Sequence, residues 1–252
     1  MKKAPIFLTL LLLLQCCAPI SHIAPAATTT LVSTPERFGF TSNFEITWNK
    51  KVYDVPIGVD PEEIHLLWHG DYDNDGINEY FLENSHAGIG CHTNIFVIDY
   101  DIQKDEYRVF DEWSATCANV NWEDISNDGR PEIVTRDEFF SSHYRGLPEA
   151  TFAASPIKIL QYENHRLTDV TREYPTSVYQ DANFLLSRAT SKDEHYGLLF
   201  LDAYIADMYL IGMKDEGIKN YLKICSQGSS DVECQTFLND ILKSIHEAGY
   251  DH

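Results

Sequence analysis

Basic residues are scarce in this sequence. Its 19 lysines and arginines stand against 39 aspartates and glutamates, which gives a formal net charge of −20. Nucleic-acid phosphates would repel such a chain, so the composition argues against nucleic-acid binding. The charge suits metal-binding loops, a solvated acidic surface or a basic protein partner.

Long hydrophobic runs are missing beyond the start of the chain. Residues 1–3 are basic at two positions, and residues 6–14 form an apolar stretch that is too short for a stable membrane anchor. The pattern predicts a secretory signal over residues 1–26, with small residues for cleavage at 24–26. The mature protein is then expected in the periplasm, at the cell surface or outside the cell, with no transmembrane segment.

Cysteines are few. Cys16 and Cys17 fall in the predicted signal, where a lipid anchor is the less favoured alternative because no small residue precedes either of them. An even number remains, which suits disulfides in an oxidising compartment: Cys91, Cys117, Cys225 and Cys234. Of the three possible pairings we favour Cys91–Cys117 with Cys225–Cys234, because each pair stays within one predicted segment.

Motifs of the common enzyme classes are absent: there is no GxSxG, Walker loop, HExxH or GxGxxG after a strand. His65 and His69 are four residues apart, but they lie in a predicted strand, where that spacing does not form a helical zinc site. His92 follows Cys91 and is more typical of an ordinary loop histidine than of a ligand. No catalytic residue is therefore predicted.

Strand patterns dominate residues 38–176, while the Thr-rich residues 27–37 before them predict a linker. The predicted strands cover residues 44–48, 51–56, 64–68, 80–82, 94–100, 107–110, 120–122, 133–135, 157–162 and 166–170. The long connection 136–156 is rich in aromatic residues. It is expected to fold over the end of the sheet, or alternatively to act as a binding loop.

One acidic stretch organises this region: Asp71-Tyr72-Asp73-Asn74-Asp75-Gly76-Ile77-Asn78-Glu79. Oxygen-bearing side chains at its first, third, fifth and ninth positions can curl a loop around a hard cation, and the glycine permits the sharp turn. The predicted ligands are Asp71, Asp73, Asp75, the backbone carbonyl of Ile77, and Glu79, directly or through water. The site is not an EF-hand, because strand patterns flank it and Leu82 stands at the twelfth position.

A second copy begins at Asp124, 53 residues after the first (from position 71 to position 124), a period that suits a repeated β unit such as a propeller blade. Its predicted ligands share the offsets of the first loop: Asp124, Ser126, Asp128, Arg130 and Glu132. Ser126 replaces an acid and Arg130 adds a positive charge, which weakens this site. The alternative for either loop is an Asx-rich turn without metal, disfavoured in the first because three close carboxylates repel one another.

The segments 70–76 and 128–134 resemble the calcium loops of FG-GAP/VCBS-type repeats, which occur in bacterial secreted and surface proteins. The resemblance covers roughly residues 60–175 and implies Ca²⁺ as the cofactor in a β-propeller-like setting. It also implies a ligand set: Asp71, Asp73, Asp75, Glu79, Asp124, Asp128 and Glu132. Ser126 departs from the family's usual Asp or Asn, and two copies are too few for a closed propeller of about four or more blades.

Helical patterns follow the β region. Capping-box sequences begin at Ser191 and Ser230, and the predicted helices cover residues 191–212, 215–225 and 230–249. The predicted fold is therefore α+β, with a mostly antiparallel β domain of propeller-blade-like repeats over 38–176 and a small α-helical module over 181–250.

These features together predict an exported calcium-binding protein that acts as a non-enzymatic binding or structural module. A basic exported protein, such as an envelope hydrolase that the chain would inhibit, is the expected partner. The alternative is a metal-dependent hydrolase that uses the acidic loop residues.

Overall fold

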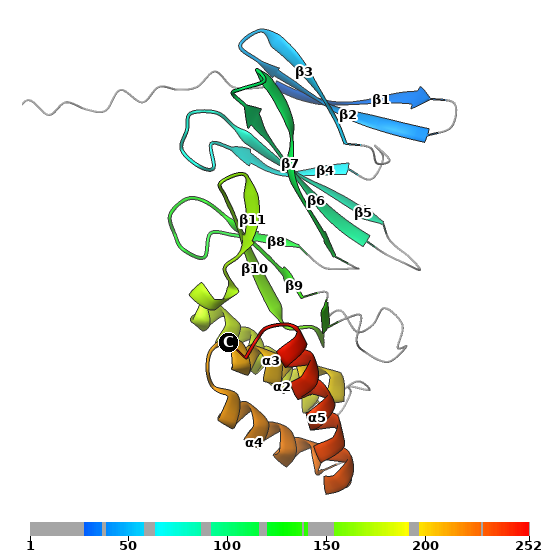
Figure 1. The fold of residues 1–252 in the computed structure, drawn as a ribbon, viewed down its shortest axis with the longest axis vertical. Coiled ribbons are helices and arrows are strands. Elements are labelled where there is room, and N and C mark those ends of the chain that lie inside the picture. Colours follow the sequence, from blue (N-terminus) through cyan, green and yellow to red (C-terminus); the bar gives the residue numbers. More distant parts are fainter. Residues whose placement is uncertain are drawn as a thin grey trace, which may run out of the picture.

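Three antiparallel sheets and a helical module succeed one another along the long axis of the molecule (Figure 1). The structure is a computed structural model, and it describes residues 28–36, 39–57, 64–86, 92–115, 120–137, 139–140, 154–191, 197–227 and 229–251. The α+β class with antiparallel sheets is confirmed. Over the described ranges each sheet is open and the sheets do not close into a propeller, so the propeller-like arrangement stays a prediction.

Several expectations lie outside the described residues. They are the signal over 1–26 with Cys16 and Cys17, the Cys91–Cys117 pairing, and most of the connection 136–156. None of the helices within the described ranges has the length and apolar character that crossing a membrane requires.

The first sheet contains β1 (Thr28–Glu36), β2 (Gly39–Trp48) and β3 (Lys51–Pro56) in chain order. The linker expected over 27–37 is corrected here, because β1 covers most of it and pairs with β2 along its whole length. The threonines that suggested a linker are β-branched and favour strands. The predicted turn at Asn49 and Lys50 is confirmed, with φ of 49° and 67°.

The second sheet contains β4 (Ile64–Gly70), β5 (Glu79–His86), β6 (His92–Asp101) and β7 (Glu106–Ala115), again in chain order. Both faces of this sheet are buried, and successive residues of a strand point to opposite faces, so one strand contributes to two cores. Tyr80 and Leu82 pack in the core shared with the first sheet, whereas Phe81 packs in the core toward the third sheet.

The third sheet repeats this order with β8 (Asn121–Glu123), β9 (Glu132–Arg136), β10 (Ile157–Glu163) and β11 (Arg166–Asp169). In both sheets an acidic loop joins the first strand to the second, so the sequence repeat corresponds to a repeated four-stranded meander. The buried residues of the core between these two sheets, called the junction core below, are Tyr72, Phe81, Ile95, Val97, Ile133, Leu160 and Tyr162.

The helical module contains a short 3-10 helix, η3 (Thr171–Glu173), and four helices: α2 (Pro175–Ala189), α3 (Gly197–Leu210), α4 (Lys214–Cys225) and α5 (Asp231–Glu247). Helix α2 was not predicted from the sequence. Its proline at the first position and its buried residues at 178, 182 and 185 are nevertheless typical of a helix.

The other three predicted helices are confirmed by α3, α4 and α5, whereas the capping box predicted at Ser191 depends on Glu194, which lies outside the described residues. Ser230 and Glu233 form the predicted capping box of α5, and Gly249 follows it with a φ of 74°. The predicted Cys225–Cys234 disulfide joins the end of α4 to the first turn of α5.

Candidate metal site

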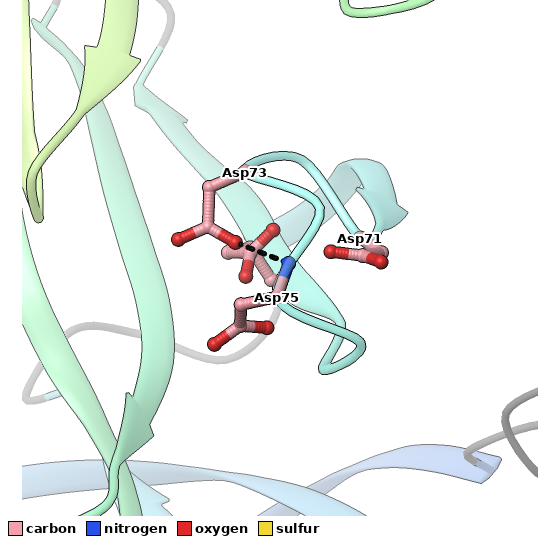
Figure 2. Close-up of side chains that lie close together, drawn as sticks. Asp71, Asp73 and Asp75 are labelled. Atoms are coloured by element: carbon pink, nitrogen blue, oxygen red, sulfur yellow. Dashed lines mark hydrogen bonds between the residues drawn. The ribbon is translucent and has the colours of Figure 1, made fainter.

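The first acidic loop joins β4 to β5 and is shaped by hydrogen bonds from its own backbone. The Gly76 N–H donates to Asp71 Oδ2 at 3.1 Å, and the Asp75 N–H donates to Asp73 Oδ1 at 3.1 Å (Figure 2). The Ile77 N–H donates to Asp75 Oδ1 at 2.8 Å. Gly76 has a φ of 90°, which an L side chain rarely adopts, so glycine is required at this turn.

Four carboxylates meet in this loop. Asp71, Asp73 and Asp75 lie on the exposed turn (Figure 2), and Glu79 reaches in from the start of β5. One oxygen of each of the four lies within 4.8 Å of one oxygen of every other. The predicted carboxylate ligands of the first loop are therefore brought together, in an arrangement that can hold a hard cation.

Glu79 is the buried member of this group, and one of its oxygens lacks a hydrogen-bond partner. It is 0% exposed, its Oε2 accepts a hydrogen bond from the Tyr72 N–H, and its Oε1 has no hydrogen-bond partner. Burial raises the pKa of Glu79 to about 9, with smaller contributions in the same direction from the nearby Asp99, Asp73 and Asp75. A buried carboxylate with a vacant oxygen among other acids needs either a proton or a cation.

Two neighbours connect the loop to the third sheet. Tyr72 is 1% exposed in the junction core, and its hydroxyl donates to the Pro131 carbonyl of the second acidic loop at 3.2 Å. Asp99 on β6 is 2% exposed and accepts a hydrogen bond from the Tyr162 hydroxyl at 2.9 Å. The first acidic loop thus lies at the contact between the second and third sheets.

The second acidic loop joins β8 to β9 and repeats three of the four backbone hydrogen bonds; the fourth differs, because the Asp128 N–H donates to Asp124 Oδ1 at 3.0 Å, whereas the matching Asp75 N–H donates to Asp73. The Gly129 N–H donates to Asp124 Oδ2 at 3.0 Å, and the Arg130 N–H donates to Asp128 Oδ1 at 2.9 Å. The Ile125 N–H donates to Glu132 Oε2 at 2.8 Å, as the Tyr72 N–H does to Glu79. The two loops therefore share most of their local structure.

The side chains of the second loop differ in their partners. Arg130 Nε donates to Asp128 Oδ2 at 2.9 Å, and the Tyr174 hydroxyl donates to Glu132 Oε1 at 2.8 Å. The guanidinium of Arg130 lowers the pKa of Asp128, and a hydrogen bond from the Ser126 side chain lowers it further. Within the described residues the acids of this loop do not gather as those of the first loop do. Metal ligation by the second set, and by the carbonyls of Ile77 and Arg130, stays a prediction.

Three residues that contact or lie near these loops were not predicted from the sequence: Tyr72, Asp99 and Tyr174. Tyr72 is an aromatic residue between two aspartates of a mostly polar loop, which is a visible signal of burial. Asp99 and Tyr174 carry no such signal, because they lie 20 or more positions away from the residues they act on.

The chain is similar to a distant relative among known proteins. The chain is 27% identical over 218 residues to a probable thylakoid lumen protein of Synechocystis sp., a match that covers 81% of this chain. The chain spans about three-fifths of the length of that curated relative (61%). No family model matches the chain, and no solved structure matches it. The FG-GAP/VCBS resemblance therefore stays a prediction.

Proposed function

We propose that this protein is an exported, non-enzymatic calcium-binding protein, in which an ion in the first acidic loop stabilises the contact between the second and third sheets. One observation carries the proposal: Glu79 is 0% exposed, its Oε1 has no hydrogen-bond partner, and one of its carboxylate oxygens lies within 4.8 Å of an oxygen of each of the three aspartates. An orphaned buried oxygen is costly, and a divalent cation would satisfy it while cancelling the repulsion among the four acids.

The donor set favours calcium over the other common metals. All four side chains offer oxygen, and the group contains no histidine or cysteine, the ligands that zinc prefers. Magnesium demands near-ideal octahedral geometry and keeps much of its water, whereas calcium accepts six to eight oxygens in a flexible loop.

The ion would act on the junction core through Tyr72, which lies between two of the proposed ligands. Its ring packs edge-on against Tyr162 of the third sheet at 6.0 Å and is tilted against Phe81 of the second at 5.4 Å. Holding Asp71 and Asp73 on one ion would restrict the backbone of Tyr72 and so favour this packing. Ion-binding energy would then become stability of the folded state.

Export and the partner belong to the same proposal. The description of the Synechocystis relative as a lumen protein supports an exported location. The net charge of −20 supports a basic partner, such as an exported hydrolase that this chain would inhibit. Binding to such a partner is expected to weaken steeply as salt is added.

The hydrolase alternative has less support. Backbone N–H groups already occupy oxygens of Asp71, Asp73 and Asp75, and a bound ion would take up more of their lone pairs. A hollow of about 420 Å³ lies between α2 and α4, but amides, hydroxyls, aliphatic groups and Lys223 line it, with no carboxylate. A non-enzymatic role therefore accounts better for the acids.

Thermal unfolding in calcium and in chelator tests the proposal. At a calcium concentration about 100 times the dissociation constant, binding adds roughly 2.7 kcal/mol to the free energy of unfolding. For a chain of this size that corresponds to a rise in Tm of about 5–10 °C. The double substitution Asp73→Ala and Asp75→Ala should abolish the rise, whereas Asp54→Ala, which removes an exposed acid from β3, should keep it. An identical Tm of the unsubstituted protein with and without calcium would refute the proposed function.

A further inference from the structure

We propose that the second acidic loop binds no metal ion, because Arg130 and Tyr174 bond to the carboxylates whose counterparts in the first loop would bind the ion. The second loop then serves to attach the helical module to the third sheet. The inference rests on the proposed function only for the role given to the first loop; its own evidence is the set of contacts made by the second.

The two loops can be compared atom by atom, because their backbones agree. Asn74 and Gly76 have φ of 65° and 90°, and the matching Asn127 and Gly129 have φ of 59° and 88°. At the ninth position, a backbone N–H donates to Oε2 of Glu79 and likewise to Oε2 of Glu132. A difference in metal binding between the two loops would therefore come from their side chains and not from their backbone conformation.

At the fifth position the difference is a guanidinium. In the first loop the seventh residue is Ile77, and Asp75 receives only a backbone N–H from it. In the second loop the seventh residue is Arg130, which gives Asp128 both its backbone N–H and its side chain, with Nε at 2.9 Å from Oδ2. A divalent cation at this carboxylate would have to displace a charge-assisted pair and remain beside a positive group, which is unfavourable.

At the ninth position the difference is a hydroxyl from another part of the chain. Glu79 Oε1 is unpartnered, whereas Glu132, equally 0% exposed, receives the Tyr174 hydroxyl on Oε1 at 2.8 Å. Tyr174 immediately precedes Pro175, the first residue of α2. The buried acid of the second loop thus bonds to the start of the helical module instead of to an ion.

The net charge of the two sites agrees with this assignment. The first loop gathers four acids with no base among its nine residues, while the second has three acids, a serine and an arginine. The first therefore needs an external cation to relieve repulsion, and the second supplies its own.

Calcium titration of a full-length chain with a silenced first loop tests the inference. Asp73→Ala and Asp75→Ala remove two ligands there, and isothermal titration calorimetry of this variant should show no calcium binding. Adding Ser126→Asp, Arg130→Ile and Tyr174→Phe should create a site that binds one ion per chain and raises the Tm. The matched control replaces Arg130→Ile by Arg130→Lys, which retains the positive charge and should prevent binding.

Two results would overturn the inference. One is calcium binding by the silenced chain that a further Asp128→Asn abolishes. The other is a redesigned chain that keeps its native circular dichroism but binds no calcium. If the unsubstituted protein itself bound none while the redesigned loop bound one, the proposed function would fail and this inference would stand.

A second measurement does not depend on metal. Tyr174→Phe in the otherwise unchanged chain should lower the Tm by the same amount in calcium and in chelator, because it breaks an attachment that no ion replaces. An unchanged Tm would remove Tyr174 from the assignment.

Discussion

Glu79→Gln should change the sign of its effect with calcium. In chelator the buried carboxylate lies among three other acids, and burial raises its pKa from 4.5 to about 9. At pH 7 the unfolded chain is ionised at this position while the folded chain keeps the proton, which costs about 3 kcal/mol of stability. Glutamine carries no charge, so the variant should be more stable than the unsubstituted protein. The expected gain in the free energy of unfolding is roughly 1–3 kcal/mol, because any unpaired polar atom of the buried amide offsets part of it.

In calcium the order should reverse. The ion would ionise Glu79 and bind it, and replacing that carboxylate would forfeit most of the roughly 2.7 kcal/mol that calcium adds at about 100 times its dissociation constant. In chelator, the stability of the unsubstituted protein should fall as the pH rises. Because the folded-state pKa lies above the unfolded one, the unsubstituted protein should lose stability as pH rises from 4.5 toward 9, and the advantage of Glu79→Gln should vanish below that interval.

Urea denaturation followed by circular dichroism, in calcium and in chelator, measures all of these differences. Glu132→Gln is the matched control, because it makes the same change at the same offset of the second loop. Both oxygens of Glu132 already accept hydrogen bonds, so this variant should be less stable by about 1–3 kcal/mol in calcium and chelator alike. If Glu79→Gln also destabilised the protein in chelator, the argument that this carboxylate is strained without an ion would be wrong.

Two further predictions concern the helical module. Burial raises the pKa of Asp207 well above its usual 3.8, and the neighbouring Asp181 raises it further, so this acid costs stability once the pH exceeds about 4. Asp207→Asn retains an oxygen for the Ile157 N–H, and its gain in unfolding free energy should be absent near pH 4 and present near pH 7; equal values at both would contradict the assignment. The double substitution Cys225→Ser and Cys234→Ser opens a disulfide across nine positions and should cost about 2–3 kcal/mol of unfolding free energy, measured by urea denaturation without reductant; an unchanged value would contradict a stabilising role for this disulfide.

Much of the β region follows from short-range sequence patterns, and these are the parts that sequence analysis predicted. Alternating apolar residues located the strands, and the Asn-Lys and Asp-rich turns located the connections, because strand faces and turn angles depend on neighbouring residues. The same reasoning failed at β1. A threonine-rich segment favours a strand only when a partner edge is available, and β2 provides that edge.

The α2 helix was missed for a different reason. Its first residue, Pro175, ends a β pattern as readily as it begins a helix, and only Val178, Ala182 and Leu185 form its fully buried face. Those three are spaced as one helical stripe, but the module that they cover is not visible from the segment itself. The burial of α3 on nearly all sides, by contrast, is evident in its almost continuous apolar sequence.

The unequal outcome of the two acidic loops shows where local pattern stops being informative. Both sequences specify the same turn, and both turns form. Arg130, which is visible within the pattern, accounts for one difference between them. The other is the partner of the ninth residue, which for Glu132 is a tyrosine 42 positions away. A pattern of nine residues contains the ligands of a site, but it does not contain the competitor that occupies one of them.

Successive hydrogen bonds, moreover, link the first loop to the second and the second to the helical module. The Tyr72 hydroxyl in the first donates to Pro131 in the second, the next residue is Glu132, and Glu132 accepts the hydroxyl of Tyr174 at the start of α2. Both hydrogen bonds are partly buried, so loosening one exposes polar groups at the next. An ion in the first loop would therefore stabilise most strongly the contact nearest to it, between the second and third sheets. The attachment of the helical module would need no ion, because it is made by a shared buried core and by hydrogen bonds such as that of Tyr174 to Glu132.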